Sequence, residues 1–346
     1  EKLSRETVIK NLAIDNKGDA YSQKIWTYTT TDAGAVMPGE VSYQEITNRT
    51  FDSEHNVKNQ SVFNYLNEGG ILLDVQEIRN LTFDLRGNVT EQRIATYSGS
   101  LDDATSVLYD VKVIFNADIN SLGYAKTTTI YKYASGSIDD DPLLAGLHDG
   151  VINYSNFMDA TVMTTTKFDL RGNALEQTVE KYYTEDKSGK PVQTQTITNE
   201  PYDFHDRQTK STITTKNALL EEIDTQVIWY DSYDAYGNTI DQRIYRYEKS
   251  DLSNFIDYKT IHNDYADLKA ARRGNATHTT INRYASETVW DDSTRIERQE
   301  IDNHPLTIDS RGNIVDQTID LYVTISGLEK LSRETVIKNL AIDNKG

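Results

Sequence analysis

The chain has 346 residues, a formal net charge of -18, 37% hydrophobic residues and no cysteine. The acidic balance excludes nucleic acid as an expected partner, because backbone phosphates attract clustered Lys and Arg, and no basic cluster is present. The lack of cysteine excludes disulfides, thiolate metal sites and cysteine nucleophiles. No run approaches the ~18 apolar residues of a transmembrane helix, so we expect no membrane span in this segment.

Residues 329–346, EKLSRETVIKNLAIDNKG, repeat residues 1–18 letter for letter. The repeat period is therefore 328 residues, and residues 329–346 restart it. Self-similarity of this kind is typical of tandem arrays. We expect the chain to be a segment of a much longer array.

A shorter motif recurs inside the period. Its clearest copies are FDLRGNVTEQRIATY (83–97), FDLRGNALEQTVEKY (168–182), YDAYGNTIDQRIYRY (233–247) and IDSRGNIVDQTIDLY (308–322). With the Gly as anchor, nine copies of about 36 residues follow one another, and their anchors are Gly18, His55, Gly87, Gly123, Gly172, Asp206, Gly237, Gly274 and Gly312. Eight of the nine spacings fall between 31 and 38 residues, which supports the alignment.

Each copy predicts a tight turn. Three residues before the anchor stand Asp15, Asp52, Asp84, Asn120, Asp169, Asp203, Asp234 and Asp309 in eight copies, and Ala271 in the ninth. An Asp or Asn at the first position of a turn caps backbone amides, and a Gly at the fourth supplies a positive φ. We therefore interpret these residues and the glycines Gly18, Gly87, Gly123, Gly172, Gly237, Gly274 and Gly312 as structural turn residues.

A strand is predicted on each side of the turn. Seven residues after the anchor every copy has Ile or Val, and the preceding residue is always polar, as in Arg93 and Ile94. This alternation is typical of a strand with one dry face and one wet face. Another apolar residue, Ile in six copies and Met163 in a seventh, stands nine residues before the anchor.

Two further columns suggest contacts between copies. Five residues after the anchor stand Gln23, Gln60, Gln92, Gln177, Gln242 and Gln317, and ten residues after it stand Tyr28, Tyr65, Tyr97, Tyr133, Tyr182, Tyr247, Tyr284 and Tyr322. Stacking of the copies predicts an amide ladder of glutamines and an aromatic ladder of tyrosines.

The largest insertion is SGSIDDDPLLAGLHDG, residues 135–150, which we expect to form a surface loop. Its Asp139, Asp140 and Asp141 are weak candidates for calcium ligands, since carboxylate oxygens suit hard cations. The loop lacks the spacing of known calcium-binding motifs, so we favour a solvated acidic loop. We predict no other cofactor, no catalytic residues and no enzymatic activity, because no phosphate-binding loop, nucleophile elbow or metalloprotease motif is present.

The predicted fold is all-β. A two-stranded hairpin is marginal in water, so the copies are expected to pair laterally. We predict that residues 1–346 form a single array of β-hairpin repeats in a continuous spiral sheet, a β-solenoid or tube-like superhelix. In a spiral each turn can pair with, or pack on, the next, which protects sheet edges that would otherwise aggregate.

The recurring [Tyr/Phe/Ile]-Asp-x-x-Gly-Asn followed by a strand ending in Tyr resembles the YD repeats of Rhs and teneurin-type proteins. The resemblance implies hairpins that join into a long sheet spiralling around a hollow interior. The sequence departs from the family after the Gly, where Asn, as at Asn88 and Asn173, replaces the usual Arg.

The leading functional hypothesis is a structural segment of a giant extracellular or cell-surface protein that forms a filament or tube, with adjacent repeats or identical chains as partners. The alternatives are a bacterial surface adhesin or carbohydrate-binding stalk, and an Rhs-like shell around a toxin. Glycans enter in two ways. Trp26, Trp229 and Trp290 are candidates for stacking on sugar rings, and Asn48, Asn59, Asn80, Asn88, Asn153 and Asn275 begin N-glycosylation triplets.

Overall fold

The computed structural model describes residues 2–101, 103–142, 144, 148–304, 313–325 and 328–339. Over these residues the chain folds into 19 β-strands and one five-residue helix. Every pair of strands with an assigned register is antiparallel, as in β1–β2 and β18–β19. The prediction of an all-β array of hairpin repeats is therefore confirmed.

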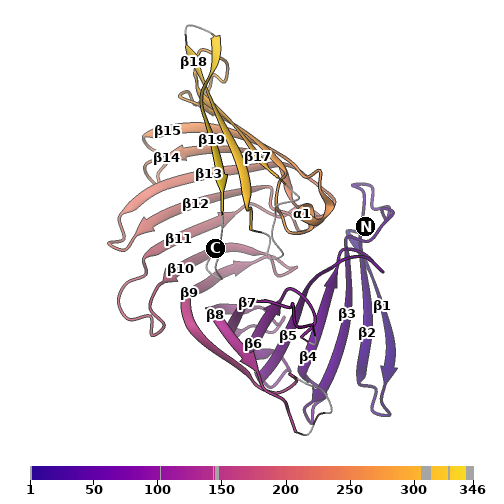
Figure 1. Ribbon diagram of the computed structural model, residues 1–346. Helices are drawn as coiled ribbons and strands as arrows, with labels where there is room; N and C mark the ends of the chain where they lie inside the picture. Colours follow the sequence, from indigo (N-terminus) through magenta and orange to yellow (C-terminus); the bar gives the residue numbers. More distant parts are fainter. Residues whose placement is uncertain are drawn as a thin grey trace. The chain divides into compact units, whose positions relative to one another are not determined.

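The chain divides into two compact units. The first covers residues 1–164 and 181–189, and the second covers residues 165–180 and 190–344. In the first unit consecutive strands pair in chain order from β1 to β9 (Figure 1). Its strands are β1 (Arg5–Ile14), β2 (Ala20–Thr29), β3 (Ser42–Phe51), β4 (Val57–Tyr65), β5 (Leu72–Phe83), β6 (Val89–Tyr97), β7 (Leu108–Ile119), β8 (Ala125–Ile138) and residues 152–164 of β9 (Ile152–Phe168).

The second unit repeats this arrangement, with consecutive pairing from β11 to β19. Its elements are residues 174–180 of β10 (Ala174–Tyr182), β11 (Gln193–Asn199), β12 (Lys210–Asn217), β13 (Glu222–Tyr233), β14 (Thr239–Tyr247), β15 (Phe255–Asp264), α1 (Leu268–Arg272), β16 (His278–Tyr284), β17 (Arg295–Asn303), β18 (Asp316–Ile325) and β19 (Leu328–Lys338). The hairpin is thus the common building block of both units.

The two apolar columns of the sequence face each other across each hairpin. The residue nine before the anchor pairs with the residue seven after it, in the pairs Ile9–Ile25, Ile46–Val62, Ile78–Ile94, Ile114–Ile130, Ile197–Ile213 and Ile228–Ile244. Cross-strand β-branched pairs stabilise a sheet by roughly 0.2–1 kcal/mol each. One register is therefore repeated through hairpins whose sequences differ.

The core of the first unit is thin and partly aromatic. A cluster formed by Ala95, Tyr97, Val111, Val113, Tyr133, Ile138 and Ile152 is buried on β6 to β9. In the second unit the most deeply buried large side chain is Tyr258, at 1% exposure. Two members of the first cluster, Tyr97 and Tyr133, come from the tyrosine column, so that column supplies core as well as surface.

Two connections differ from the predicted pattern. Residues 135–138 extend β8 and pair with residues 152–155 of β9, so only residues 139–151 form the inserted loop. The expectation of a surface loop from residue 135 onward was wrong there, because Ile138 and Ile152 pair across the hairpin and are buried in the core. Before Gly274 the chain forms α1 instead of a tight turn, and Asp267 caps this helix by accepting a hydrogen bond from the Ala270 N–H at 2.7 Å.

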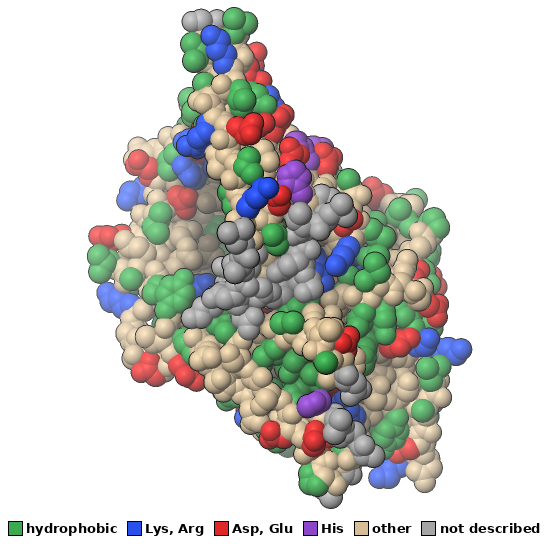
Figure 2. Space-filling model, in the orientation of Figure 1, with side chains coloured by type: hydrophobic (Ala, Val, Ile, Leu, Met, Phe, Trp, Pro, Cys, Tyr) green, Lys and Arg blue, Asp and Glu red, His purple; other side chains and the backbone are tan. Residues whose placement is uncertain are grey.

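Charges of both signs are mixed over the surface. Figure 2 shows acidic and basic side chains interspersed on the visible face. Many form cross-strand pairs such as Arg243–Asp231, with 2.7 Å between Nη2 and Oδ1. Among the described residues, no helix has the length and apolar character that crossing a membrane requires.

Candidate functional site

The predicted turn residues that the structure describes lie in tight turns, except Gly274, which follows α1. At Asp84 the side-chain Oδ1 accepts the N–H groups of Arg86 at 2.8 Å and Asn88 at 3.0 Å. The Gly87 N–H also donates to the Asp84 carbonyl at 3.0 Å. The same side-chain geometry occurs at Asp15, Asp52, Asn120, Asp169, Asp203 and Asp234. Asp309 and Gly312 lie outside the described residues.

The fourth turn position is left-handed. The backbone φ is positive at Gly18, Gly87, Gly123, Gly172, Gly237 and Gly274. His55 and Asp206, which replace Gly at this position, adopt φ values of 67° and 63°. In four turns an Asn follows the anchor and donates its side-chain amide to the turn Asp, as Asn88 does to Asp84 at 2.9 Å. That hydrogen bond lowers the pKa of the Asp84 carboxyl.

Three glutamines of the column bond to asparagines to which the sequence analysis gave no structural role. Gln92 Nε2 donates to Asn80 Oδ1 at 2.6 Å, and Gln23 Nε2 donates to Asn11 Oδ1 at 2.8 Å. Gln317 makes the same bond to Asn303, and Gln177 donates to the Thr165 hydroxyl. Where Thr or Ser replaces Gln, its hydroxyl serves, as Thr128 does for Asn116 and Ser211 for Asn199.

The same asparagines connect each hairpin to the preceding one. Asn80 Nδ2 donates to the Val57 carbonyl at 2.8 Å, and Val57 lies two residues after the anchor of the preceding hairpin. The equivalent bonds are Asn48–Ala20, Asn116–Val89, Asn199–Ala174, Asn263–Thr239, Asn303–Ala276 and Asn339–Ile314. We call this recurring pair of bonds, from Gln, Ser or Thr to Asn and from Asn to the preceding carbonyl, the amide clamp.

The asparagine column was readable in part. Asn11, Asn48, Asn80, Asn116 and Asn199 stand seven residues before their anchors, but Asn263 and Asn303 stand eleven and nine residues before theirs. The helix α1 lengthens the connection after Asn263 and so breaks the fixed spacing. A direct ladder between successive glutamines is replaced by the clamp because equivalent residues of successive hairpins are two strands apart, roughly 9.6 Å. Gln60 faces Asn48 and Gln242 faces Tyr230 in the pairing register.

The clamp also bears on glycosylation. Asn48 and Asn80 each begin a glycosylation triplet, yet they are buried at 4% and 7% exposure and their side-chain amides donate to backbone carbonyls of the preceding hairpin. Asn59, in a third triplet, is buried at 7% and donates to the Asp149 carbonyl. These three side chains have structural roles in the folded chain and are not available to carry a glycan.

Four tyrosines of the column, Tyr65, Tyr133, Tyr247 and Tyr284, pack against aromatic residues of neighbouring strands. Tyr65 contacts Tyr43 with ring centroids 5.6 Å apart, and Tyr284 contacts Tyr258 at 5.9 Å. Tyr97, Tyr133, Tyr247 and Tyr284 are buried, whereas Tyr28, Tyr65, Tyr182 and Tyr322 are half-buried. The Tyr133 hydroxyl donates to Glu185 at 2.7 Å, and burial together with this bond raises the pKa of Tyr133.

Described residues of the inserted loop line an open cavity of about 420 Å³ in the first unit. Its lining combines cationic, amide and acidic groups, including Lys58, Asn59, Arg79, Arg93, Asp139 and Asp149. Arg93 uses Nη1 to bond the Ile152 carbonyl at 3.0 Å, and its guanidinium lies over the Tyr154 ring.

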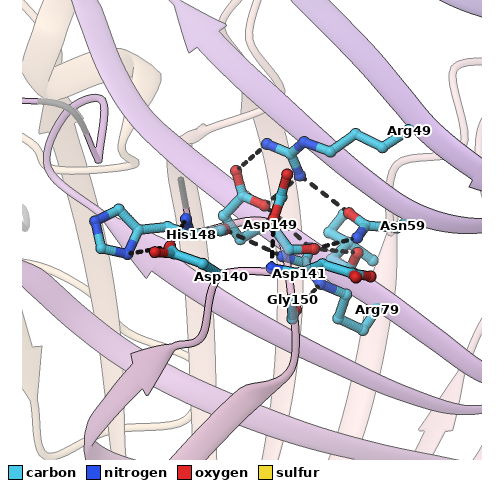
Figure 3. Close-up of polar contacts among 10 residues, drawn as sticks. Arg49, Asn59, Arg79, Asp140, Asp141, His148, Asp149 and Gly150 are labelled. Carbon is cyan, nitrogen blue, oxygen red and sulfur yellow. Dashed lines mark hydrogen bonds and ion pairs between the residues drawn. The ribbon is translucent and has the colours of Figure 1, made fainter. Parts of the chain in front are cut away.

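Arg79 fastens the loop to the sheet (Figure 3). Its Nε donates to the Gly150 carbonyl at 2.6 Å, and its Nη1 pairs with Glu77 at 3.0 Å. Glu77 also accepts two bonds from Arg49, at 2.7 and 2.9 Å. Arg79 is 5% exposed and Glu77 2% exposed, so these charges are buried but matched. Burial lowers the pKa of the Arg79 guanidinium, and Glu77 opposes that shift.

The acidic loop residues organise the loop itself. The Asp139 side chain accepts from Asn153 at 2.8 Å, and Asp140 accepts from the His148 N–H at 2.6 Å. The Asp141 N–H donates to Asp149 Oδ1 at 2.8 Å, and Asp149 is buried at 2% exposure. The described residues contain no group of three or more acidic, His or Cys side chains placed to hold a metal ion. The solvated acidic loop expected from the sequence is wrong for Asp149, because it folds onto the sheet.

Comparisons with known proteins identify no family. No family model matches the sequence, and no curated protein matches it. Among solved structures, one match is a chain of a Tc holotoxin pore from Photorhabdus luminescens, with a TM-score of 0.17 and 12% sequence identity. That match covers 94% of this chain and 18% of the toxin chain, so this chain spans less than a fifth of its length. A TM-score this low carries no argument about fold or function.

Proposed function

We propose that this chain is a structural segment of a giant extracellular protein, in which hairpin repeats continue from one 328-residue unit to the next and build a filament or tube. The partners of the segment are then adjacent repeats of the same chain or identical chains. The proposal gives the protein a mechanical role.

The observation that supports this proposal most is the recurrence of the amide clamp. It joins successive hairpins in both compact units, at Asn80 and Asn116 in the first and at Asn199, Asn263 and Asn303 in the second. A catalytic protein needs one distinctive constellation of residues. A repeated connector is instead what a chain needs when each repeat packs only on its neighbours.

Electron microscopy of the native parent protein tests this function. We expect elongated particles with a repeat along the long axis that corresponds to one 328-residue unit. A globular, monodisperse particle without such a repeat would contradict the proposal. The parent gene supplies an independent check, since many consecutive units favour a fibre and a single unit beside a toxin domain favours an Rhs-like shell.

The loop cavity favours a surface adhesin as the second candidate. Its paired guanidinium, amide and carboxylate groups are suited to a polar ligand such as a glycan. A glycan array probed with the chain and with an Arg93→Ala variant tests this reading. Arg93 lines the cavity, whereas the bond that holds the loop to the sheet at the Gly150 carbonyl comes from Arg79. Saturable binding that the variant loses would support the adhesin, and absence of saturable binding would leave the structural role.

A further inference from the structure

The duplicated sequence allows one strand to be seen in two surroundings. β19 repeats residues of the β1 segment, but β1 pairs with β2 and β19 pairs with β18. Thr335 lies opposite Ile319, whereas its counterpart Thr7 lies opposite Thr27. The same strand sequence therefore pairs with β2 in one copy and with β18 in the other.

The two pairings use opposite edges of the strand. The Asn339 N–H donates to the Val315 carbonyl at 2.8 Å, so the alternate residue Thr335 also turns its backbone toward β18. In the other copy the Thr27 carbonyl accepts from Val41, which shows that Thr27 turns its backbone toward β3. The Thr7 N–H consequently points away from β2. Among the described strands, β2 alone pairs with β1, and every residue of β1 is exposed.

The amide clamp identifies what the outer edge of β1 would bind. Asn339 donates its side-chain amide to the Ile314 carbonyl at 2.9 Å, which is the bond of the clamp that reaches the preceding hairpin. Its counterpart Asn11 accepts from Gln23, but the Asn11 side-chain NH₂ has no partner within the described residues. Half of the clamp is thus formed at Asn11, and the missing half is the carbonyl that Ile314 supplies to Asn339.

We propose that the outer edge of β1 is a docking edge for the β18 strand of a second copy of the 328-residue unit. The register is that of β18 with β19, so Ile319 of the second copy lies opposite Thr7, Thr318 opposite Val8 and Gln317 opposite Ile9. The Asn11 amide then donates to the second copy's Ile314 carbonyl. This inference rests on the proposed function, because it specifies how successive units of the array connect.

The contact is head-to-tail, and such contacts propagate when the rotation between copies does not close a ring. In the full chain β19 covers the β18 edge that β1 requires. The outer edges of β1 and β19 are therefore not complementary to each other. Removal of β19 exposes β18 and makes the two open edges complementary.

Two variants that free β18 test the proposal. One is the full chain with Thr335→Pro, which removes an N–H directed at Ile319 and blocks continued pairing; the other is a chain shortened to residues 1–328. We expect both to stay β-folded by circular dichroism and to sediment as concentration-dependent multiples of a monomer close to the 39.3 kDa of the full chain. The matched substitution Thr7→Pro, added to either, should restore the monomer, and Thr7→Pro alone should leave the full chain monomeric.

Disulfide trapping fixes the register, since the chain has no cysteine of its own. In the shortened chain, Val8→Cys with Thr318→Cys should form intermolecular disulfides under mild oxidation, because directly opposed residues have the required Cα separation. Glu6→Cys with Thr318→Cys is the off-register control and should cross-link far less. Folded monomers, disulfides within one chain, equal cross-linking of both pairs or assembly that survives Thr7→Pro would each overturn the proposal.

The outcome is separable from that of the proposed function. Native filaments together with failed trapping would refute only this register. Successful trapping together with globular native particles would refute the filament while leaving the docking edge in place.

Discussion

At the scale of single residues, neutral amides connect the repeats more regularly than charges do. Asn80 bonds both to Gln92 in its own hairpin and to the Val57 carbonyl of the preceding hairpin. Salt bridges such as Lys167–Glu176, by contrast, lie on exposed side chains, where ion pairs contribute only ~0–1 kcal/mol. Asn suits the clamp because one side chain offers both a donor and an acceptor.

Substitution of Asn80 by Ala should reduce the free energy of unfolding of the first unit by about 1–3 kcal/mol, because the Gln92 amide and the Val57 carbonyl are both left without their partner. Denaturant unfolding measures this loss. Asn16→Ala is the matched control, since Asn16 is exposed, and should cost less than about 0.5 kcal/mol. Equal losses in the two variants would contradict a special role for the clamp.

The turn carboxylates predict a loss of stability in acid. Hydrogen bonds from Asn88 and from backbone amides lower the pKa of Asp84 below its unfolded value. The resulting stabilisation is fully present above about pH 4, the ordinary Asp pKa, and is lost as the pH falls through the lowered native pKa. Asn120 forms the same backbone bonds without a titrating group.

An Asp84→Asn variant should therefore be less stable than the parent at pH 7, since Asn88 loses a charged acceptor, but should lose less further stability between pH 7 and pH 3. Denaturant unfolding at the two pH values measures this difference. An identical pH dependence in parent and variant would show that Asp84 titrates with the same pKa in the folded and unfolded chain.

At the scale of elements, the inserted loop is part of the sheet's structure and not an appendage. β8 and β9 pair up to the start of the loop, and Arg79 bonds the loop through the Gly150 carbonyl, just before β9. The buried Arg79 also shares Glu77 with Arg49, so the loop, β3 and β5 meet in one ionic group. Removal of Arg79 would leave Glu77 paired with Arg49 but would leave the Gly150 carbonyl without its donor.

Arg79→Met should destabilise the first unit by about 1–3 kcal/mol, because the Gly150 carbonyl loses its donor, and should increase hydrogen exchange at the Gly150 N–H, which donates to the Asp139 carbonyl at 2.7 Å. Hydrogen exchange read by mass spectrometry measures the local effect. Lys58→Met is the control, because Lys58 lines the same cavity and is exposed. If both variants exchange alike, Arg79 does not anchor the loop.

At the scale of the whole molecule, a repeat array gains stability from interfaces between neighbours, so its strength grows with the number of hairpins. The net charge of -18 acts over longer distances and keeps separate segments apart in solution. Association is then favoured where edges match in register, as β18 and β19 do, and disfavoured elsewhere. The duplicated strand shows this match directly, because β19 has the sequence of the β1 segment and pairs with β18.

The sequence by itself determined the hairpin repeat, its turns and its strand register. Asp84, Gly87 and Ile94 stand at fixed spacings because turn capping, positive φ and alternation of side chains along a strand are local requirements. A contact between residues that are close in the chain requires the same residue types at the same spacing in every copy, so it can be recognised in the sequence.

The tertiary structure alone decided the clamp to the preceding hairpin, the helix α1 and the burial of Asp149. Asn80 and Val57 are 23 residues apart, and the intervening connection varies in length between copies, so no fixed spacing reports their contact. Asp149 likewise reads as a solvated loop residue until the sheet beneath it supplies Asn59 and Arg79. Burial of a polar group depends on partners that the fold brings from distant segments, so the sequence of one segment does not predict it.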